Sequence, residues 1–314
     1  MALIKVTDMA YARVTAPDLN VAETFLTDFG LTISARTENA IYARGTDSPH
    51  HIYIAEKGPA KLISFAYYAA SRGDLDRIAK APGASAVEPI NEPGGGMRVR
   101  LREPNGYEIE VVHGIQELSP IKVEPRPVNS GWNPLARAGD LMRLGSGPSR
   151  AKRIGHGVLA TNKLNETLDW FGNTLGLICS DDVFAGDEKN KIAAFYRCDR
   201  GDEFVDHHTF FAFDYPTSGL QHISFEVHDI DDVFKGHEYL VEKKYEHMWG
   251  IGRHLLGSQV FDYWADPWGR VHEHWADSDR LNVRQSPNNV PVEVGFNSQW
   301  GGPPPDKLLS RVFP

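Results

Sequence analysis

The sequence predicts an α+β protein in which one structural module occurs twice in tandem. Its 314 residues are enough for two domains of typical size. Short strand patterns, amphipathic helix patterns and polar turns follow one another in the same order in both halves. Internal duplication is the simplest explanation of this repeated order.

The first half opens with Met9-Ala-Tyr-Ala-Arg-Val, whose alternation predicts a strand. A helix is predicted over residues 21–29, because apolar residues recur at helical spacing and Gly30 follows as a stop signal. A further strand is predicted over residues 62–67. Residues 98–110 predict a hairpin, since two strand patterns flank an X-Pro-X-Gly turn.

The second half repeats these elements in the same order. We expect a strand over residues 153–160, a helix over 165–171, a strand over 222–227 and a hairpin over 260–273. Three pairs of positions are predicted to correspond, at separations of 145, 160 and 163 residues: Tyr11 with His156, Leu62 with His222, and Glu110 with Glu273. The growing separation places insertions in the loops of the second half, where they are best tolerated.

These patterns divide the chain into four parts. We expect residues 1–117 to form an N-terminal domain and residues 151–285 to form a C-terminal domain. Between them, residues 118–150 are rich in proline and predict a linker that packs against the domains. Residues 286–314 predict an extended tail draped over the surface.

The composition excludes several functional classes. There are 42 acidic and 33 basic residues, and no run of Lys or Arg offers a surface for nucleic acid. No apolar stretch approaches the roughly 18–20 residues of a membrane span. Two cysteines and an N-terminus without a secretory pattern predict a cytoplasmic protein.

The second half contains a candidate metal site that the first half lacks. His156, His222 and Glu273 fall on predicted neighbouring strands, and two imidazoles with one carboxylate form a facial triad with open coordination positions. Such a triad suits non-heme Fe(II), with Mn(II) as a possible substitute and zinc as a weaker candidate. The competing interpretation is that each histidine only makes structural hydrogen bonds and that Glu273, like Glu110, is a solvated strand residue.

Longer motifs resemble a known family. Arg153-Ile-Gly-His-Gly-Val, Asp206-His-His-Thr, Leu220-Gln-His-Ile-Ser-Phe and the series His254, Tyr263, Glu273 are similar to those of type I extradiol catechol dioxygenases. These enzymes belong to the vicinal oxygen chelate superfamily. The resemblance covers nearly the whole chain, and it implies tandem βαβββ modules in two glyoxalase-like domains, of which only the C-terminal one holds iron.

The resemblance also implies roles for six residues. His156, His222 and Glu273 match the iron ligands, and His208 matches the acid–base histidine beside the oxygen site. His254 and Tyr263 match groups that hydrogen-bond the oxygens of the substrate. The remaining histidines of these motifs are expected to point away from the metal, because neighbouring strand residues alternate between faces. These are His207, His272 and His274.

The implied reaction is extradiol (meta) cleavage of a catecholic ring by O2, which gives an open-chain semialdehyde or keto acid. Aromatic bulk from Trp249, Trp264 and Trp268 is expected around the mouth of the site. The residues around Glu273 most resemble enzymes for heavily substituted rings, which favours a trihydroxytoluene-type substrate from nitroaromatic degradation. An alkylcatechol or a bicyclic diol is the next candidate, and the choice between proximal and distal cleavage stays open.

Two alternatives remain at this point. The first is another enzyme of the superfamily, such as a glyoxalase or a 4-hydroxyphenylpyruvate dioxygenase. The second is a metal-free protein that binds a planar aromatic ligand. The resemblance further implies a homo-oligomer, with a tetramer favoured, and no nucleic-acid or membrane partner.

Overall fold

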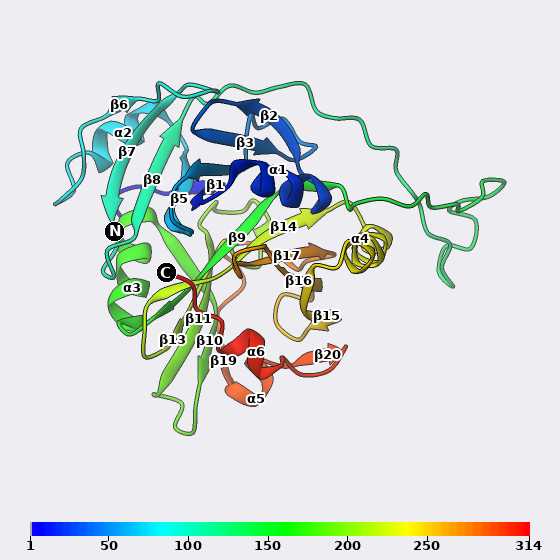
Figure 1. Ribbon diagram of the computed structural model, residues 1–314. Coiled ribbons are helices and arrows are strands. Elements are labelled where there is room, and N and C mark those ends of the chain that lie inside the picture. Colours follow the sequence, from blue (N-terminus) through cyan, green and yellow to red (C-terminus); the bar gives the residue numbers. More distant parts are fainter. Residues whose placement is uncertain (1) are drawn as a thin grey trace.

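The computed structural model describes residues 2–314 and contains two large mixed β-sheets (Figure 1). The first module supplies ten elements: β1 (Val6–Ala16), α1 (Leu19–Asp28), β2 (Thr32–Arg36), β3 (Ala40–Arg44), β4 (Tyr53–Lys57), β5 (Lys61–Ala69), α2 (Arg72–Ile78), β6 (Glu88–Pro89), β7 (Met97–Arg102) and β8 (Glu108–His113). Its eight strands form one sheet in the order β2-β3-β4-β1-β5-β8-β7-β6.

The second module repeats this plan. Its elements are β9 (Ala151–Thr161), α3 (Leu164–Trp170), the π-helical turn η1 (Phe171–Leu175), β10 (Leu177–Phe184), β11 (Lys191–Cys198), β12 (Val205–Asp206), β13 (Phe210–Asp214), β14 (Gly219–Val227), α4 (Ile230–Glu242), β15 (Glu246–His254), β16 (Val260–Ala265), β17 (Val271–Ala276) and β18 (Arg280–Leu281). In both sheets the module's first strand pairs antiparallel with a central strand, β5 or β14, which pairs parallel with a hairpin strand. The predicted α+β fold of two tandem modules is confirmed.

The strand ladders confirm two of the three predicted equivalences. In the first sheet one residue of β5 pairs with both Tyr11 and Glu110, and in the second sheet one residue of β14 pairs with both His156 and Glu273. Tyr11 therefore corresponds to His156, and Glu110 corresponds to Glu273. The bridging residues are Ala66 and Ser224.

The third predicted equivalence, Leu62 with His222, is wrong by two residues. In the second sheet His222 pairs with Val158. The corresponding residue of β1 is Arg13, and it pairs with Ser64. Both central strands carry a register irregularity at the same point, so the bulges do not explain the difference. The mismatch arises because the Ile-Ser-Phe triplets at 63–65 and 223–225 do not occupy equivalent register positions. The counterpart of His222 is therefore Ser64.

The two modules pack against each other through the sheet face opposite the candidate site. His274 Nε2 donates a hydrogen bond of 2.7 Å to the Phe29 carbonyl oxygen, and the two rings stack at 3.7 Å. His272 Nε2 lies 3.1 Å from the Tyr53 hydroxyl. Gly157 is required here, since an added Cβ would lie 2.5 Å from the Phe65 ring. Both histidines thus point away from the site, as predicted.

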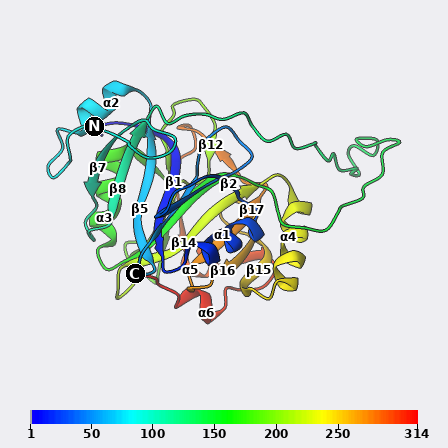
Figure 2. The ribbon, with the colours of Figure 1, turned by 45° about the horizontal axis from the view of Figure 1, so that its top comes forward.

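The segment between the modules is more exposed than predicted. In Figures 1 and 2 it leaves the body of the protein as a long loop. Arg126 attaches its first part by pairing with Asp229 and Asp232, but the Trp132 side chain is fully exposed. The prediction of a packed linker is therefore wrong for this loop. Within residues 2–314, none of the helices combines the length and apolar character needed to cross a membrane.

The C-terminal segment is also more ordered than an extended tail. It forms β19 (Asn288–Pro291), α5 (Val292–Gly295), β20 (Ser298–Trp300) and α6 (Asp306–Leu309). β19 pairs with β10 and β20 pairs with β15, so the second sheet has ten strands in the order β19-β10-β11-β13-β9-β14-β17-β16-β15-β20. The domain limits at residues 117, 150 and 285 stay predictions.

Candidate active site

Three strands of the second sheet bring two histidines and a glutamate together in its concave interior. His156 on β9, His222 on β14 and Glu273 on β17 are all buried. The Nε2 atoms of the two histidines lie 3.2 Å apart, and Glu273 Oε2 lies 3.1 Å from His156 Nε2 and 3.5 Å from His222 Nε2. The sequence-predicted triad is thus assembled in space, with one ligand atom from each residue facing a common point.

Neighbouring side chains hold these groups in orientation. Ser224 donates a hydrogen bond to Glu273 Oε2 at 2.5 Å, and Gln221 Oε1 accepts one from His222 Nδ1. Burial alone would raise the pKa of Glu273, but hydrogen bonds from the surrounding histidines hold it well below its ordinary range. Burial lowers the pKa of His156. The site therefore presents an ionised carboxylate and a neutral imidazole, which are the forms that bind metals.

The donor set fits a divalent cation. Glu273 Oε1 is buried and has no hydrogen-bond partner within residues 2–314. Over the same residues, the ion pairs of Glu273 involve only histidines, with no Lys or Arg to balance its charge. A buried, ionised carboxylate requires a positive partner. Two imidazoles and a carboxylate with open positions suit Fe(II) best among common ions.

His208 lies beside the triad and belongs to a hydrogen-bonded chain of three residues. Its ring is 4.0 Å from that of His156, and its Nδ1 lies 3.0 Å from His207 Nδ1. His207 Nε2 in turn donates to Asp181 Oδ2 at 2.5 Å. Burial, and then the nearby His156 and His207, lower the pKa of His208 well below its ordinary value. His207 points away from the triad as predicted, but the sequence did not reveal that it and Asp181 orient His208.

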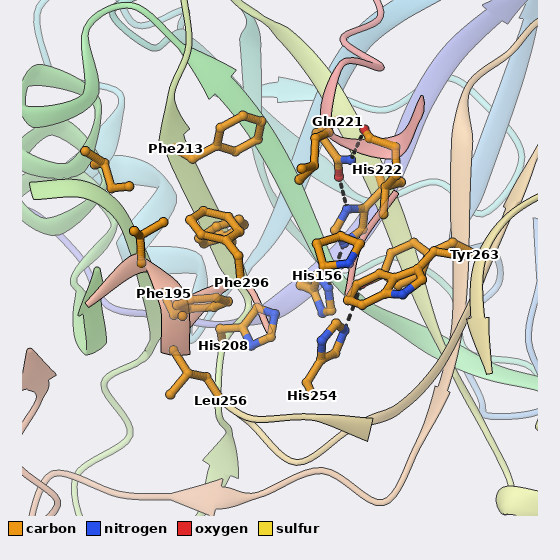
Figure 3. Close-up of a pocket in the computed structure, with 18 of the residues that line it drawn as sticks. His156, Phe195, His208, Phe213, Gln221, His222, His254, Leu256, Tyr263 and Phe296 are labelled. Carbon is orange, nitrogen blue, oxygen red and sulfur yellow. Dashed lines mark hydrogen bonds between the residues drawn. The ribbon is translucent and has the colours of Figure 1, made fainter. Parts of the chain in front are cut away.

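His254 and Tyr263 meet on the other side of the triad (Figure 3). His254 Nε2 lies 2.9 Å from the Tyr263 hydroxyl and 3.4 Å from Glu273 Oε1. Burial, together with the charge of Glu273, raises the pKa of Tyr263 well above its ordinary value, so the phenol keeps its proton. Burial lowers the pKa of His254. All six sequence-predicted residues therefore lie around one point, although their roles are proposals.

A cavity of about 360 Å³ opens onto this point. Its wall combines the candidate site residues with a large apolar surface, while no Lys or Arg lines it within residues 2–314. The apolar lining consists of Ile192, Phe195, Phe211, Phe213, Trp249, Leu256, Val292, Phe296, Pro304, Leu308 and Leu309. Part of this wall comes from the C-terminal segment, which the sequence placed on the surface.

Of the three tryptophans predicted at the mouth of the site, only Trp249 lines the cavity. Its ring stacks 5.5 Å from that of Tyr263. Trp264 is buried on the opposite face of β16, where its indole donates to Asp262, and Trp268 packs against Arg270. The prediction is therefore wrong for Trp264 and Trp268.

Gln259 is a polar cavity residue that sequence reasoning missed. Its side chain is buried and lines the cavity. Its Nε2 has no hydrogen-bond partner within residues 2–314. An unpaired buried amide is costly, so a ligand oxygen that accepts from it would bind favourably.

Comparison with known proteins places this geometry in a family. Residues 153–273 match the Glyoxalase/Bleomycin resistance protein/Dioxygenase superfamily. Metapyrocatechase 2 of Cupriavidus necator is 29% identical over 299 residues, which cover 94% of this chain and 89% of that protein. An iron-dependent extradiol dioxygenase of Rhodococcus jostii is 22% identical, with 85% of this chain and 87% of that protein covered.

Solved structures establish the same fold. Homoprotocatechuate 2,3-dioxygenase from Brevibacterium fuscum superposes with a TM-score of 0.82 at 20% identity, covering 99% of this chain and 94% of that one. A Mn(II)-bound glyoxalase from Novosphingobium aromaticivorans gives a TM-score of 0.79 at 23% identity, with 99% and 96% covered.

Residues 153–273 therefore contain a domain that matches the glyoxalase and dioxygenase superfamily, and they span most of the second module. Over nearly its whole length the chain is similar in sequence to proteins named as extradiol ring-cleaving dioxygenases, in line with the resemblance in its motifs.

Proposed function

We propose that this enzyme cleaves an apolar, substituted aromatic vicinal diol with O2 at an Fe(II) held by His156, His222 and Glu273. The observation that carries the proposal is the buried triad, whose ionised carboxylate lacks any Lys or Arg partner within residues 2–314 and which opens into an apolar cavity. The named relatives, an iron-dependent dioxygenase among them, support this choice of metal. Mn(II) is the alternative ion, since the similar glyoxalase structure is described as Mn(II)-bound.

When bound, such an ion supplies adjacent open positions at which a diol and dioxygen can exchange electrons. Holding both reactants at one point removes much of the entropy cost of their encounter, on the order of several kcal/mol. The protein's part is to bind and orient the diol, to exclude water and to move protons.

Tyr263 and His254 bind the diol oxygens. The raised pKa of Tyr263 keeps its hydroxyl protonated, so it can donate a hydrogen bond to oxygen charge that develops in the ring substituents. In this role His254 Nε2 donates to the Tyr263 hydroxyl oxygen 2.9 Å away, which leaves the hydroxyl hydrogen free for the diol. Trp249 stacks on Tyr263 and shields the pair from water.

His208 moves the proton that the O–O cleavage step requires. Its lowered pKa makes it neutral in the resting enzyme, so it can accept a proton from the diol and return it later. His207 binds its Nδ1, which leaves Nε2 free for this exchange. Asp181 accepts a hydrogen bond from His207, and Asn288 donates one of 2.7 Å to Asp181. Each residue that orients His208 is therefore itself held by a hydrogen bond.

The substrate class follows from the cavity wall. The wall is apolar and has no Lys or Arg within residues 2–314, so an anionic ring substituent would be left unpaired. The unpaired Nε2 of Gln259 favours a third oxygen on the ring, in addition to the two of the diol. This supports a trihydroxytoluene-type substrate over an alkylcatechol or a bicyclic diol. A role in nitroaromatic degradation, a homotetramer and a cytoplasmic location remain proposals.

A glyoxalase activity is less well supported, although one structural relative is a glyoxalase. A site that draws metal ligands from both modules would need Tyr11, Ser64 or Glu110 to be free. Instead, the guanidinium of Arg13 pairs with Glu110 at 3.1 Å and occupies that position.

Anaerobic loading with Fe(II), followed by O2 and a panel of aromatic diols and triols, tests the proposal. We expect O2 uptake and a yellow ring-opened product, with a methyl-substituted triol turned over more efficiently than the matching methylcatechol. Gln259→Leu should reduce that preference and leave turnover of the methylcatechol largely unchanged. Inertness of the iron-loaded enzyme towards every compound would overturn the ring-cleavage proposal, and an unchanged preference in Gln259→Leu would overturn the assignment of the third oxygen.

A further inference from the structure

A second group of two histidines and one carboxylate lies on the opposite face of β16. Side chains alternate along a strand, so Tyr263 points to the candidate active site and the neighbouring Asp262 points to the far face. There Asp262 meets His237 of α4 and His247 of β15. One ligand atom from each residue lies within 4.8 Å of the others.

The spacing of these atoms resembles that of the catalytic triad. Asp262 Oδ1 lies 2.8 Å from His247 Nε2, and Asp262 Oδ2 lies 3.1 Å from His237 Nδ1. The two imidazole planes are nearly perpendicular, at 84°. Ligand atoms around a tetrahedral zinc ion, with bonds of about 2.0–2.1 Å, lie about 3.3 Å from one another. A small outward movement of the two rings would therefore create the coordination sphere.

The charge at this point also calls for a cation. Asp262 is completely buried, and among residues 2–314 its ion-pair partners are only these two histidines. Trp264 holds the carboxylate with an indole hydrogen bond of 2.5 Å to Oδ2. Both histidines are about one-third exposed or less, so water can reach the cluster and complete the coordination of an ion.

We propose that His237, His247 and Asp262 form a second metal site, for a divalent transition ion such as Zn²⁺. Imidazole nitrogens with a single carboxylate select zinc, nickel or copper over calcium and magnesium, which prefer oxygen ligands. The site joins α4 to the two strands that carry Trp249, His254 and Tyr263. Bound metal therefore stabilises the wall of the active site from behind without touching the substrate.

The competing account is a purely hydrogen-bonded cluster in which a protonated histidine balances Asp262. In that account the ring nitrogens carry protons, and the cluster has no affinity for zinc. The two accounts differ in metal content, which can be measured independently of enzyme activity.

The test uses the full-length, iron-loaded enzyme dialysed anaerobically against micromolar ZnCl2, with both metals then measured by mass spectrometry. We expect one zinc per chain in addition to undiminished iron, together with a higher melting temperature. His247→Gln should weaken zinc binding at least tenfold and abolish the thermal shift. His113→Gln, which changes a histidine on β8 of the first module, is the matched control and should bind zinc as the wild type does.

His237→Gln provides a second variant of a partly exposed residue, in case His247→Gln folds poorly. Two results would overturn the proposal: zinc that enters only as iron leaves, or zinc binding that survives unchanged in both variants. The iron and zinc results are separated by His222→Ala, which removes the catalytic triad but leaves the second cluster available for the same zinc measurement. A failure of iron loading would therefore count against the catalytic triad alone.

Discussion

The two modules build the same strand framework around a buried glutamate but balance its charge in different ways. In the first module Arg13 and Arg98 each place a guanidinium nitrogen 3.1 Å from a Glu110 oxygen. Tyr11 and Ser64 donate to the same carboxylate at 2.8 and 2.6 Å. These four donors fill the position that the second module leaves to His156 and His222.

The difference shows what separates a structural site from a catalytic one on a single fold. A guanidinium is attached covalently and leaves no open position for substrate, whereas a metal ion held by two imidazoles does. The competing interpretation, in which Glu110 and Glu273 are solvated strand residues, is wrong, because Glu110 is completely buried and paired and Glu273 is completely buried. Both modules thus need a positive charge beside their glutamate, and in the proposed function only the second takes it from solution, as a metal ion.

The largest expected effect comes from removing a histidine of the second module. His222→Ala should lower bound iron from about one per chain to nearly none and abolish ring cleavage, because one of three protein ligands is lost. Metal analysis after gel filtration measures this. Ser64→Ala, the matched change in the first module, should retain full iron, and iron near one per chain in His222→Ala would refute the assignment.

A change that separates proton transfer from metal binding comes next. His208→Phe should lower kcat by about 10²–10⁴-fold, the usual contribution of a general acid–base group. Iron content should stay at the wild-type level, because the proposed role of His208, whose ring lies 4.0 Å from that of His156, is proton transfer and not metal binding. Steady-state kinetics and metal analysis on one sample check both statements. Loss of iron in this variant would show that His208 is itself a ligand.

In the first module the corresponding experiment removes the internal cation. Arg13→Met leaves Glu110 buried with Arg98 as its remaining guanidinium partner, and breaking a buried ion pair costs about 3–5 kcal/mol. Urea unfolding should show this loss of stability, while iron per folded chain remains unchanged. A variant as stable as the wild type would mean that Arg13 does not balance the glutamate.

The smallest expected effect concerns the boundary between the modules. Burial lowers the pKa of His272 and of His274 to about 4. Between that value and about 6.5 the unfolded chain binds more protons than the folded one, so stability is complete above pH 6.5 and declines as the pH falls. Each of the two histidines should lower the free energy of unfolding by about 2 kcal/mol when the pH falls from 7 to 5.

Unfolding free energies at these two pH values measure the effect. His272→Gln, which cannot titrate, should lose less stability on acidification than the wild type. His113→Gln serves as the control and should follow the wild type. Identical losses in all three proteins would show that the module boundary does not respond to pH.

The duplicated strand pattern predicted His156, His222 and Glu273, and the resemblance of the longer motifs to a known family added His208, His254 and Tyr263. Sequence reasoning could not find residues that reach the site by tertiary packing, such as Asp181 behind His207, or Phe296 from the C-terminal segment. The match of Leu62 with His222 failed for a local reason. An Ile-Ser-Phe triplet occurs in both strands, but in the paired register it lies two residues further along β14 than along β5.

The central claim is that only the second module binds the catalytic metal. Anomalous diffraction at the iron edge from iron-loaded crystals tests it most directly. We predict one peak per chain, between His156, His222 and Glu273, and none beside Glu110. A peak at Tyr11, Ser64 and Glu110, or no peak at the predicted triad, would contradict the account.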